Sequence, residues 1–323
     1  MKTFNDYKIF NSYIVRRSLE LIPVLLGISL VTFCLIQFMP SDPAVITLRA
    51  ADIPTTPESI AAMREKLGLN RSLPVQYLSW LWRIFHGDFG QSFFTGKPVI
   101  QEVMNYLPNT LILLIFTTIL IGLISLPVGV LAAFYRDSWF DQFSRLFAYI
   151  GTSMPNFWLG FILIYLFSIK LGWVPITSRG TISGWILPSV TLALAPSAIY
   201  ARLLRASLLH SLGENYVLYA RSRGLTELRV VFSYGLKNAI FPVITVFGLG
   251  LGHLLAGTVV VENVFAIPGL GRFAVQSILN RDYPMMQCYV CLSAVIFVTL
   301  NFGVDLLYNY FDPRVRLGEE VSS

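Results

Sequence analysis

The sequence predicts an all-α polytopic membrane protein with six transmembrane helices, cytoplasmic N- and C-termini, and an extracytoplasmic insert between the first two helices. Of its 323 residues, 55% are apolar and only 13% are charged, whereas an ordinary soluble domain carries about 25% charged residues. The mean hydropathy is +0.64. A water-soluble fold of this length could not bury so many apolar side chains, so the composition excludes a soluble enzyme and a disordered chain. It also argues against nucleic-acid binding, although the net charge is +6.

Six apolar stretches approach the length of about 20 residues that a helix needs to cross the hydrocarbon core. The first, 19–39, is predicted to be an uncleaved span because Gln37–Pro40 offers no small-residue cleavage site. The other five predicted spans are 107–134, 143–169, 185–204, 239–261 and 285–311.

The predicted orientation follows from the basic residues, which gather in cytoplasmic loops of membrane proteins. Basic residues precede the first predicted span, follow the second and fourth, and follow the last, which places segments 1–18, 205–238 and 312–323 in the cytoplasm. The two short outer loops contain only four basic residues, Lys170, Arg179, Arg272 and Arg281.

The insert, 40–106, is polar and predicted to be structured. Thr56–Ser59 has the form of a helix start, with a proline near the first turn and an acid after it. A second amphipathic stretch, Val75–Phe85, contains aromatic residues suited to a membrane interface. We expect this insert to lie outside, where a solute or its carrier would dock.

Proline lies inside several predicted spans, at positions 23, 127, 155, 188, 196 and 242. Such breaks are tolerated where neighbouring helices or a water-filled cavity satisfy the freed carbonyls, as in a transport pathway, but proline is also common in membrane helices. Met154 beside Pro155 could offer a soft sulfur ligand, and His253 is the single histidine within a span. Met154, Pro155 and His253 are the candidates for the pathway; the alternative, which the sequence favours for Met154 and His253, is a packing role. Gly248-x-x-x-Gly252 would let another helix approach closely.

The segment 205–238 is basic and predicted to contain two short helices. Tyr216–Arg223 has a helical pattern, Gly224 can end the helix, and Thr226 can begin another. This arrangement is either a docking element for a partner protein or an ordinary basic cytoplasmic loop.

Taken together, many separated motifs resemble those of a permease subunit of a bacterial ABC importer of the peptide/nickel class, over nearly the whole chain. The matching stretches are Tyr13–Arg17, Leu67–Tyr77, Gly87–Ser92, Leu107–Thr110, Ser153–Trp158, Tyr216–Leu225, Leu236–Ala239, Pro242–Thr245, Glu262–Gly271, Asn280–Pro284, Asp305–Tyr308 and Asp312–Arg314.

The resemblance implies that 205–238 is similar to the EAA-type loop that docks into a groove of the ATPase subunit. The residues expected to form this coupling site are Tyr216, Ala220, Arg221, Arg223, Gly224, Leu225, Lys237 and Asn238. The glutamate of that pattern is replaced here, since Leu218 and Tyr219 precede Ala220, so no role of that acid carries over.

The resemblance also implies partners: a second permease, expected to be a homologous different chain, two ATPase subunits and an extracytoplasmic solute-binding protein. ATP and Mg²⁺ are expected on the ATPase subunits and no cofactor on this chain. Gly90–Pro98 departs from a P-loop because its spacer has one residue too many and proline replaces the Ser/Thr that binds Mg²⁺.

Two further stretches bear on the cargo. These stretches, Asp42–Glu58 and Trp80–Trp82, resemble nickel or nickel-metallophore permeases more than dipeptide permeases. The alternative is a dipeptide or oligopeptide permease. Which residues bind a metal, if any, is unknown from the sequence. A self-contained secondary transporter would need internal repeats and charged relays, and an intramembrane enzyme would need a convergent catalytic set; neither pattern is evident.

Overall fold

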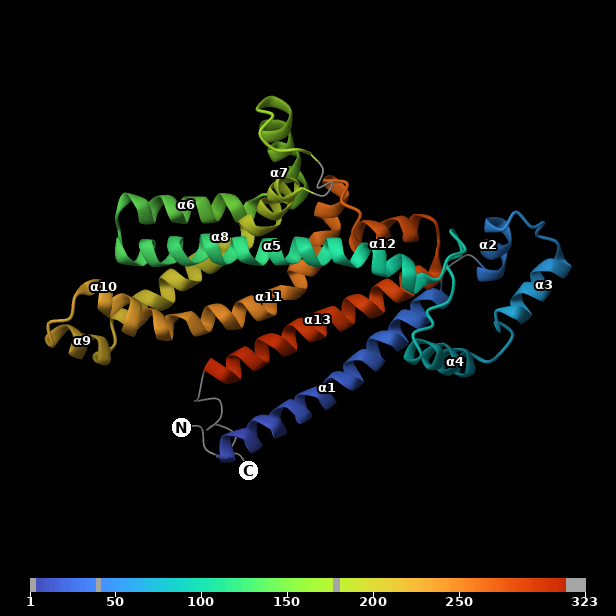
Figure 1. Cartoon of the computed structure of the whole chain (residues 1–323), viewed down its shortest axis with the longest axis horizontal. Coiled ribbons are helices and arrows are strands. Elements are labelled where there is room, and N and C mark those ends of the chain that lie inside the picture. The colour runs from blue at the N-terminus through green and yellow to red at the C-terminus, as the bar shows by residue number, and fades with distance from the viewer. Residues whose placement is uncertain (1–3, 39–41, 177–180, 312–323) are drawn as a thin grey trace. The chain divides into compact units, whose positions relative to one another are not determined.

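The computed structural model describes residues 4–38, 42–176 and 181–311 (Figure 1). Within these ranges the regular structure is helical, and one isolated antiparallel bridge joins Gln91 to Pro98. The predicted tail, 312–323, and the first three residues of the predicted N-terminal segment lie outside the described residues.

Five helices in the described part of the chain are long and apolar enough to cross a membrane. They are α1 (Phe4–Gln37), α5 (Val99–Phe134), α8 (Ile186–Leu212), α11 (Leu236–Val264) and α13 (Tyr283–Phe311). A short 3₁₀ turn, η2 (Ile182–Trp185), extends the start of α8. Each of the five coincides with a predicted span, which confirms those five stretches as membrane-length helices.

The third predicted span, 143–169, is helical but broken in the structure. It forms α6 (Trp139–Ser153), α7 (Asn156–Leu163) and a π-helical turn, η1 (Ile164–Lys170), with a bend of 107° between the two arms. Proline disfavours the helical conformation of the residue before it, and Met154 is accordingly extended, at φ −90° and ψ 124°. The stretch counts as a sixth span only if the bent pair crosses the membrane as one unit.

The chain divides into two compact units. The first contains residues 1–109 and 268–299, and the second contains 110–267 and 300–323. The long helices α5 and α13 each contribute one part to each unit.

In the first unit, the predicted insert contains three short helices: α2 (Pro43–Ala50), α3 (Pro57–Lys66) and α4 (Leu73–Phe85). Its last residues, 99–106, already belong to α5. Thr56 caps α3, accepting a hydrogen bond from the Ser59 N–H at 3.3 Å, so the predicted helix start is confirmed. Helix α4 includes the predicted stretch 75–85 and packs on α1, where the Tyr77 and Ser29 hydroxyls lie 2.9 Å apart.

A small core completes this unit where α5 and α13 meet α12 (Leu270–Leu279). Its buried members are Val99, Val103, Leu270, Met285 and Cys288. Beside it, the buried Asp282 carboxylate accepts hydrogen bonds from the Ser92 hydroxyl and the Phe93 N–H.

In the second unit, glycines let the long helices approach closely. A Cβ on Gly250 of α11 would lie 2.3 Å from the Tyr200 hydroxyl of α8, and one on Gly248 would lie 2.5 Å from Cγ1 of Val304 in α13. The predicted close approach at Gly248 is therefore confirmed. Two short helices, α9 (Asn215–Ser222) and α10 (Glu227–Val230), lie at one end of α8 and α11, and α7 lies at the other end (Figure 1).

Candidate functional site

The predicted coupling segment, 205–238, contains the two short helices that its sequence pattern predicts. Helix α8 ends at Leu212, α9 and α10 follow, and a π-helical turn, η3 (Val231–Gly235), leads into α11. Gly224 lies between α9 and α10 with φ +77°, and a Cβ there would meet no atom within 4 Å. Glycine is therefore needed at this turn for its left-handed backbone rather than for lack of space.

The segment has a small apolar core of its own. Val217 and Ala220 of α9 and Val230 of α10 are buried together, and Leu225 and Tyr234 pack against them. Across the turn, the Arg221 guanidinium donates two hydrogen bonds to the Glu227 carboxylate, at 2.9 and 3.1 Å. The two short helices therefore form one compact element rather than an irregular loop.

A chain of hydrogen bonds attaches this element to both neighbouring helices. The Asn238 amide donates to the Tyr216 hydroxyl at 2.9 Å, the Tyr216 and Ser211 hydroxyls lie 2.5 Å apart, and Ser211 donates to the Gly235 carbonyl at 3.1 Å. Because each hydroxyl has one hydrogen, the consistent assignment has Tyr216 donating to Ser211. Tyr216 and Asn238 were predicted site residues, whereas Ser211 was not singled out from the sequence.

The exposed surface of this compact element combines apolar and basic side chains. Four of its large apolar residues are more than half exposed: Leu218, Tyr219, Leu228 and Phe232. The Arg223 guanidinium lies 5.9 Å from the Tyr219 ring centre. Arg223, Arg229 and the predicted site residue Lys237 are exposed. Apolar and aromatic side chains with arginine are typical of interface centres, so the surface is suited to binding another protein.

The predicted pathway residues lie on two elements of the second unit. Met154 is half-buried and Pro155 exposed at the α6–α7 break, and His253 is exposed on α11. Four residues after His253, a Cβ on Gly257 would lie 3.6 Å from the Asn156 amide nitrogen, so the start of α7 packs on α11 one turn beyond the histidine. Among the described residues, no group of three or more His, Cys, Asp or Glu side chains is arranged to hold a metal ion.

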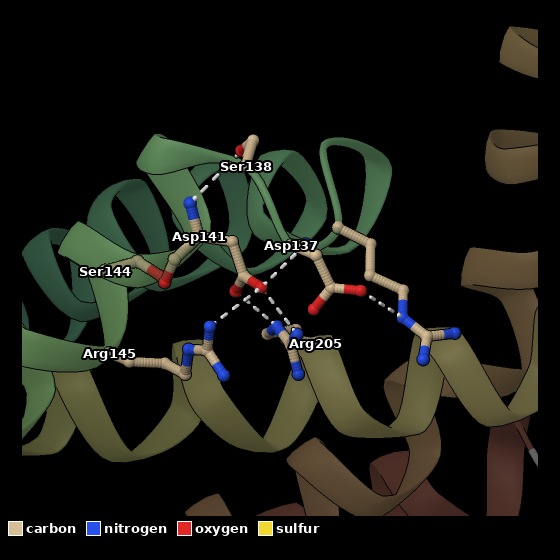
Figure 2. A network of polar contacts seen from close by, with 7 residues as sticks. Asp137, Ser138, Asp141, Ser144, Arg145 and Arg205 are labelled. Atoms are coloured by element: carbon tan, nitrogen blue, oxygen red, sulfur yellow. Dashed lines mark hydrogen bonds and ion pairs between the residues drawn. The ribbon is translucent and has the colours of Figure 1, made fainter.

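Two buried acids in the second unit were missed in the sequence. Asp141 of α6 pairs with Arg205, the first residue of the coupling segment (Figure 2), and Glu262 of α11 accepts a hydrogen bond from the Thr110 hydroxyl at 2.6 Å. Both lie within or beside apolar stretches, where an acid is costly and needs a partner. That rule could have singled them out, but their partners are distant in the sequence.

Comparison with known proteins defines the class of the chain. Its curated relatives include a dipeptide transport system permease protein from Alkalihalophilus pseudofirmus, at 38% identity over 94% of this chain and 99% of the relative. An oligopeptide transport system permease protein from Bacillus subtilis is 40% identical, and a glutathione transport system permease protein from Salmonella typhimurium is 39% identical, with the same coverage of both chains. The chain is thus a membrane permease subunit of an ABC importer and an inner-membrane, multi-pass protein.

The chain belongs to the family of inner membrane components of binding-protein-dependent transport systems. The family model matches residues 125–317, and a model of the N-terminal part of such components matches residues 10–114. A crystal structure of an amino acid ABC transporter with histidines aligns to 66% of this chain and 94% of the other at 19% identity, with a TM-score of 0.47, which is too low to add to this assignment.

Proposed function

We propose that this chain forms part of the translocation pathway for small peptides, which an extracytoplasmic binding protein delivers. The observation that carries the proposal is the set of relatives named for dipeptides, oligopeptides and glutathione, at 38–40% identity over 94% of the chain. These names favour peptides over the nickel or nickel-chelate cargo that the sequence stretches 42–58 and 80–82 suggested. Nickel remains the second candidate, on those two stretches alone.

The transport cycle needs three further kinds of subunit. A second permease, expected to be a homologous different chain, completes the pathway, and two ATPase subunits bind ATP and Mg²⁺ and hydrolyse the nucleotide. This chain carries no cofactor in the proposed cycle. Its termini and its coupling segment face the cytoplasm, and its insert faces the binding protein.

The coupling segment docks on the ATPase subunits and carries their movement to the membrane helices. Three features support this role: the compact fold of the segment, its attachment to both α8 and α11 through Tyr216, and its exposed apolar and basic surface. Closure of the ATPases would shift the populations of inward- and outward-open states, which requires that the ATPases bind the two states with different affinity.

Reconstitution of the complete complex in liposomes tests the cargo. We expect ATP-dependent uptake of a labelled dipeptide or tripeptide in the presence of the binding protein, and no competition by Ni²⁺ or a nickel-histidine chelate. Uptake of ⁶³Ni that a peptide does not compete with would select the nickel alternative. Peptide flux by this chain without its partners would instead indicate a secondary transporter.

A further inference from the structure

A buried ion pair joins α6 to α8 where the coupling segment begins. Asp141, in the first turn of α6, is fully buried, and its carboxylate accepts two hydrogen bonds from Arg205 of α8, from Nε at 2.5 Å and from Nη2 at 2.6 Å (Figure 2). The Arg205 side chain is itself only 18% exposed. A two-pronged arginine–carboxylate pair fixes orientation as well as distance, so it holds the start of α6 at one position along α8.

The surroundings of Asp141 reinforce this geometry. The Asp137 N–H donates to the carboxylate at 3.1 Å, the Ser138 hydroxyl accepts from the Asp141 N–H at 3.4 Å, and an Arg145 nitrogen lies 3.7 Å from the carboxylate (Figure 2). Burying a charge carries a desolvation cost that apolar packing would avoid. The pair is therefore better explained by the position it imposes than by the stability it adds.

Helix α6 is held to α8 at its other end too. A Cβ on Gly151 would make ordinary contacts with Ala198 at 3.6 Å and Leu194 at 3.8 Å. Two residues later α6 ends at Ser153, directly before the Met154–Pro155 break. With an ion pair at one end and packing contacts at the other, α6 is expected to move together with α8.

The second arm of the break, α7, packs on α11 and also on α8. A Cβ on Gly160 of α7 would lie 3.0 Å from Cγ1 of Val264 and 3.2 Å from the ring of Phe265, at the end of α11. The same Cβ would lie 3.6 Å from Cγ2 of Thr191 in α8. Helices α8 and α11 are the two helices that leave the coupling segment. The first arm of the break is thus tied to α8, and the second arm is tied to α11 as well as to α8.

We infer that Asp141 and Arg205 are positioning residues for transport: their ion pair carries the movement of the coupling segment through α8 and α6 to the break at Met154–Pro155. The inference rests on the proposed function, since it assumes that the coupling segment is driven by the ATPase subunits. It assigns to the pair the coupling of ATP hydrolysis to peptide movement, and neither peptide binding nor ATPase docking.

The test measures ATP hydrolysed per peptide imported by the complete complex in liposomes. For Arg205→Gln and Asp141→Asn we expect ATPase subunits to remain bound and hydrolysis to continue. Uptake is expected to fall so that the ratio rises about tenfold, within the range of about 5- to 150-fold that coupling free energies span. The double variant should be no worse than either single variant, because both remove one interaction. Arg205→Lys, which keeps the charge but loses the two-pronged geometry, should give an intermediate ratio.

Two matched variants make the same charge changes outside the pair. The first is Arg202→Gln, because Arg202 is exposed and lies one turn before Arg205 on α8. The second is Asp137→Asn, because the Asp137 side chain is exposed and asparagine accommodates its φ of +59°. Both should keep the wild-type ratio. Because the ratio is independent of the amount of folded complex, a loss of stability alone would lower uptake and hydrolysis together and leave it unchanged.

The outcomes separate the two levels of the argument. A wild-type complex that imports no peptide with ATP would overturn the proposed function. If the wild-type complex imports peptide with ATP, and Arg205→Gln and Asp141→Asn hydrolyse the same amount of ATP per peptide as the wild type, the inference alone is overturned. If Arg205→Gln or Asp141→Asn fails to assemble, Arg205→Lys is the deciding variant. A wild-type ratio of ATP hydrolysed to peptide imported in Arg205→Lys would also contradict a role for the two-pronged geometry.

Discussion

Two ion pairs in the second unit differ mainly in burial, and burial decides what each contributes at the scale of a residue. Arg221 and Glu227 are 38% and 56% exposed, whereas Arg205 and Asp141 are 18% and 0% exposed. Exposed pairs contribute about 0–1 kcal/mol because water and salt screen them. Removing one partner of a buried pair leaves a charge that the interior cannot solvate, at a cost of about 3–5 kcal/mol.

The first prediction compares truncations of these pairs. Asp141→Ala should lower the free energy of unfolding by about 3 kcal/mol, at the low end of the buried-pair range because Arg205 keeps some access to water. Glu227→Ala should lower it by about 1 kcal/mol or less. Thermal or denaturant unfolding of the purified chain in detergent gives both values. Equal losses in the two variants would contradict the difference in burial.

The second prediction concerns Gly224, whose φ of +77° is left-handed. A β-branched side chain is strained there, and the left-handed conformation costs an ordinary residue about 1–2 kcal/mol. Gly224→Val should therefore distort the turn between α9 and α10 and weaken binding of the ATPase subunits in a pull-down. Gly224→Asn is the control, because asparagine tolerates this conformation and the position has open space. Unchanged binding in the valine variant would argue against a docking role for this turn.

Residues whose role depends on local sequence could be predicted, and residues whose role depends on distant contacts could not. Thr56 begins a helix and Gly224 ends one because of their own backbone and side-chain chemistry. Asp141 pairs with a residue 64 positions away, and Glu262 accepts from one 152 positions away. No pattern along the chain gives those distances, because helix packing alone brings the partners together.

At the scale of an element, the sequence predicted that Pro155 would break a helix and that Gly248 would allow close helix packing. It predicted neither the angle of the bend nor the helix that packs on Gly248. Pro155 was predicted to break its span, but the 107° bend depends on how α7 packs beyond the break. Gly248 was predicted to allow a close approach, but the sequence did not identify α13 as the partner helix. Both missing facts belong to tertiary packing, which short motifs do not encode.

The third prediction tests the approach of α11 to α13. Gly248→Ala would place a Cβ 2.5 Å from Cγ1 of Val304, and since valine has a stiff side chain, the helices must separate. We expect a loss of about 1–3 kcal/mol, the usual cost of overpacking. Gly122→Ala, at a helical position with no atom within 4 Å of the added Cβ, should have little effect. Val304→Ala should restore stability to Gly248→Ala, and a lack of rescue would place the strain elsewhere.

At the scale of the whole molecule, the number of membrane crossings determines which side each functional segment faces. Composition and hydropathy were enough to predict a membrane protein with spans near the observed positions. They could not tell whether α6 and α7 cross together, because a bent pair and a re-entrant loop have the same composition. If the pair crosses, three crossings separate the insert from the coupling segment, and the two face opposite sides. If it is re-entrant, only two crossings separate them, and they face the same side.

The fourth prediction uses this parity to test the proposed topology. Glu58 in the insert and Ser222 in the coupling segment are exposed. Each can be changed to cysteine, one at a time, in a chain whose Cys34, Cys288 and Cys291 are replaced by alanine. A membrane-impermeant maleimide should label the insert cysteine in spheroplasts and the coupling-segment cysteine only in inverted vesicles; the cysteine-free chain is the blank. Labelling of both positions from the same side would mean that α6 and α7 form a re-entrant loop. The coupling segment would then lie on the side of the binding protein, where no ATPase subunit could reach it.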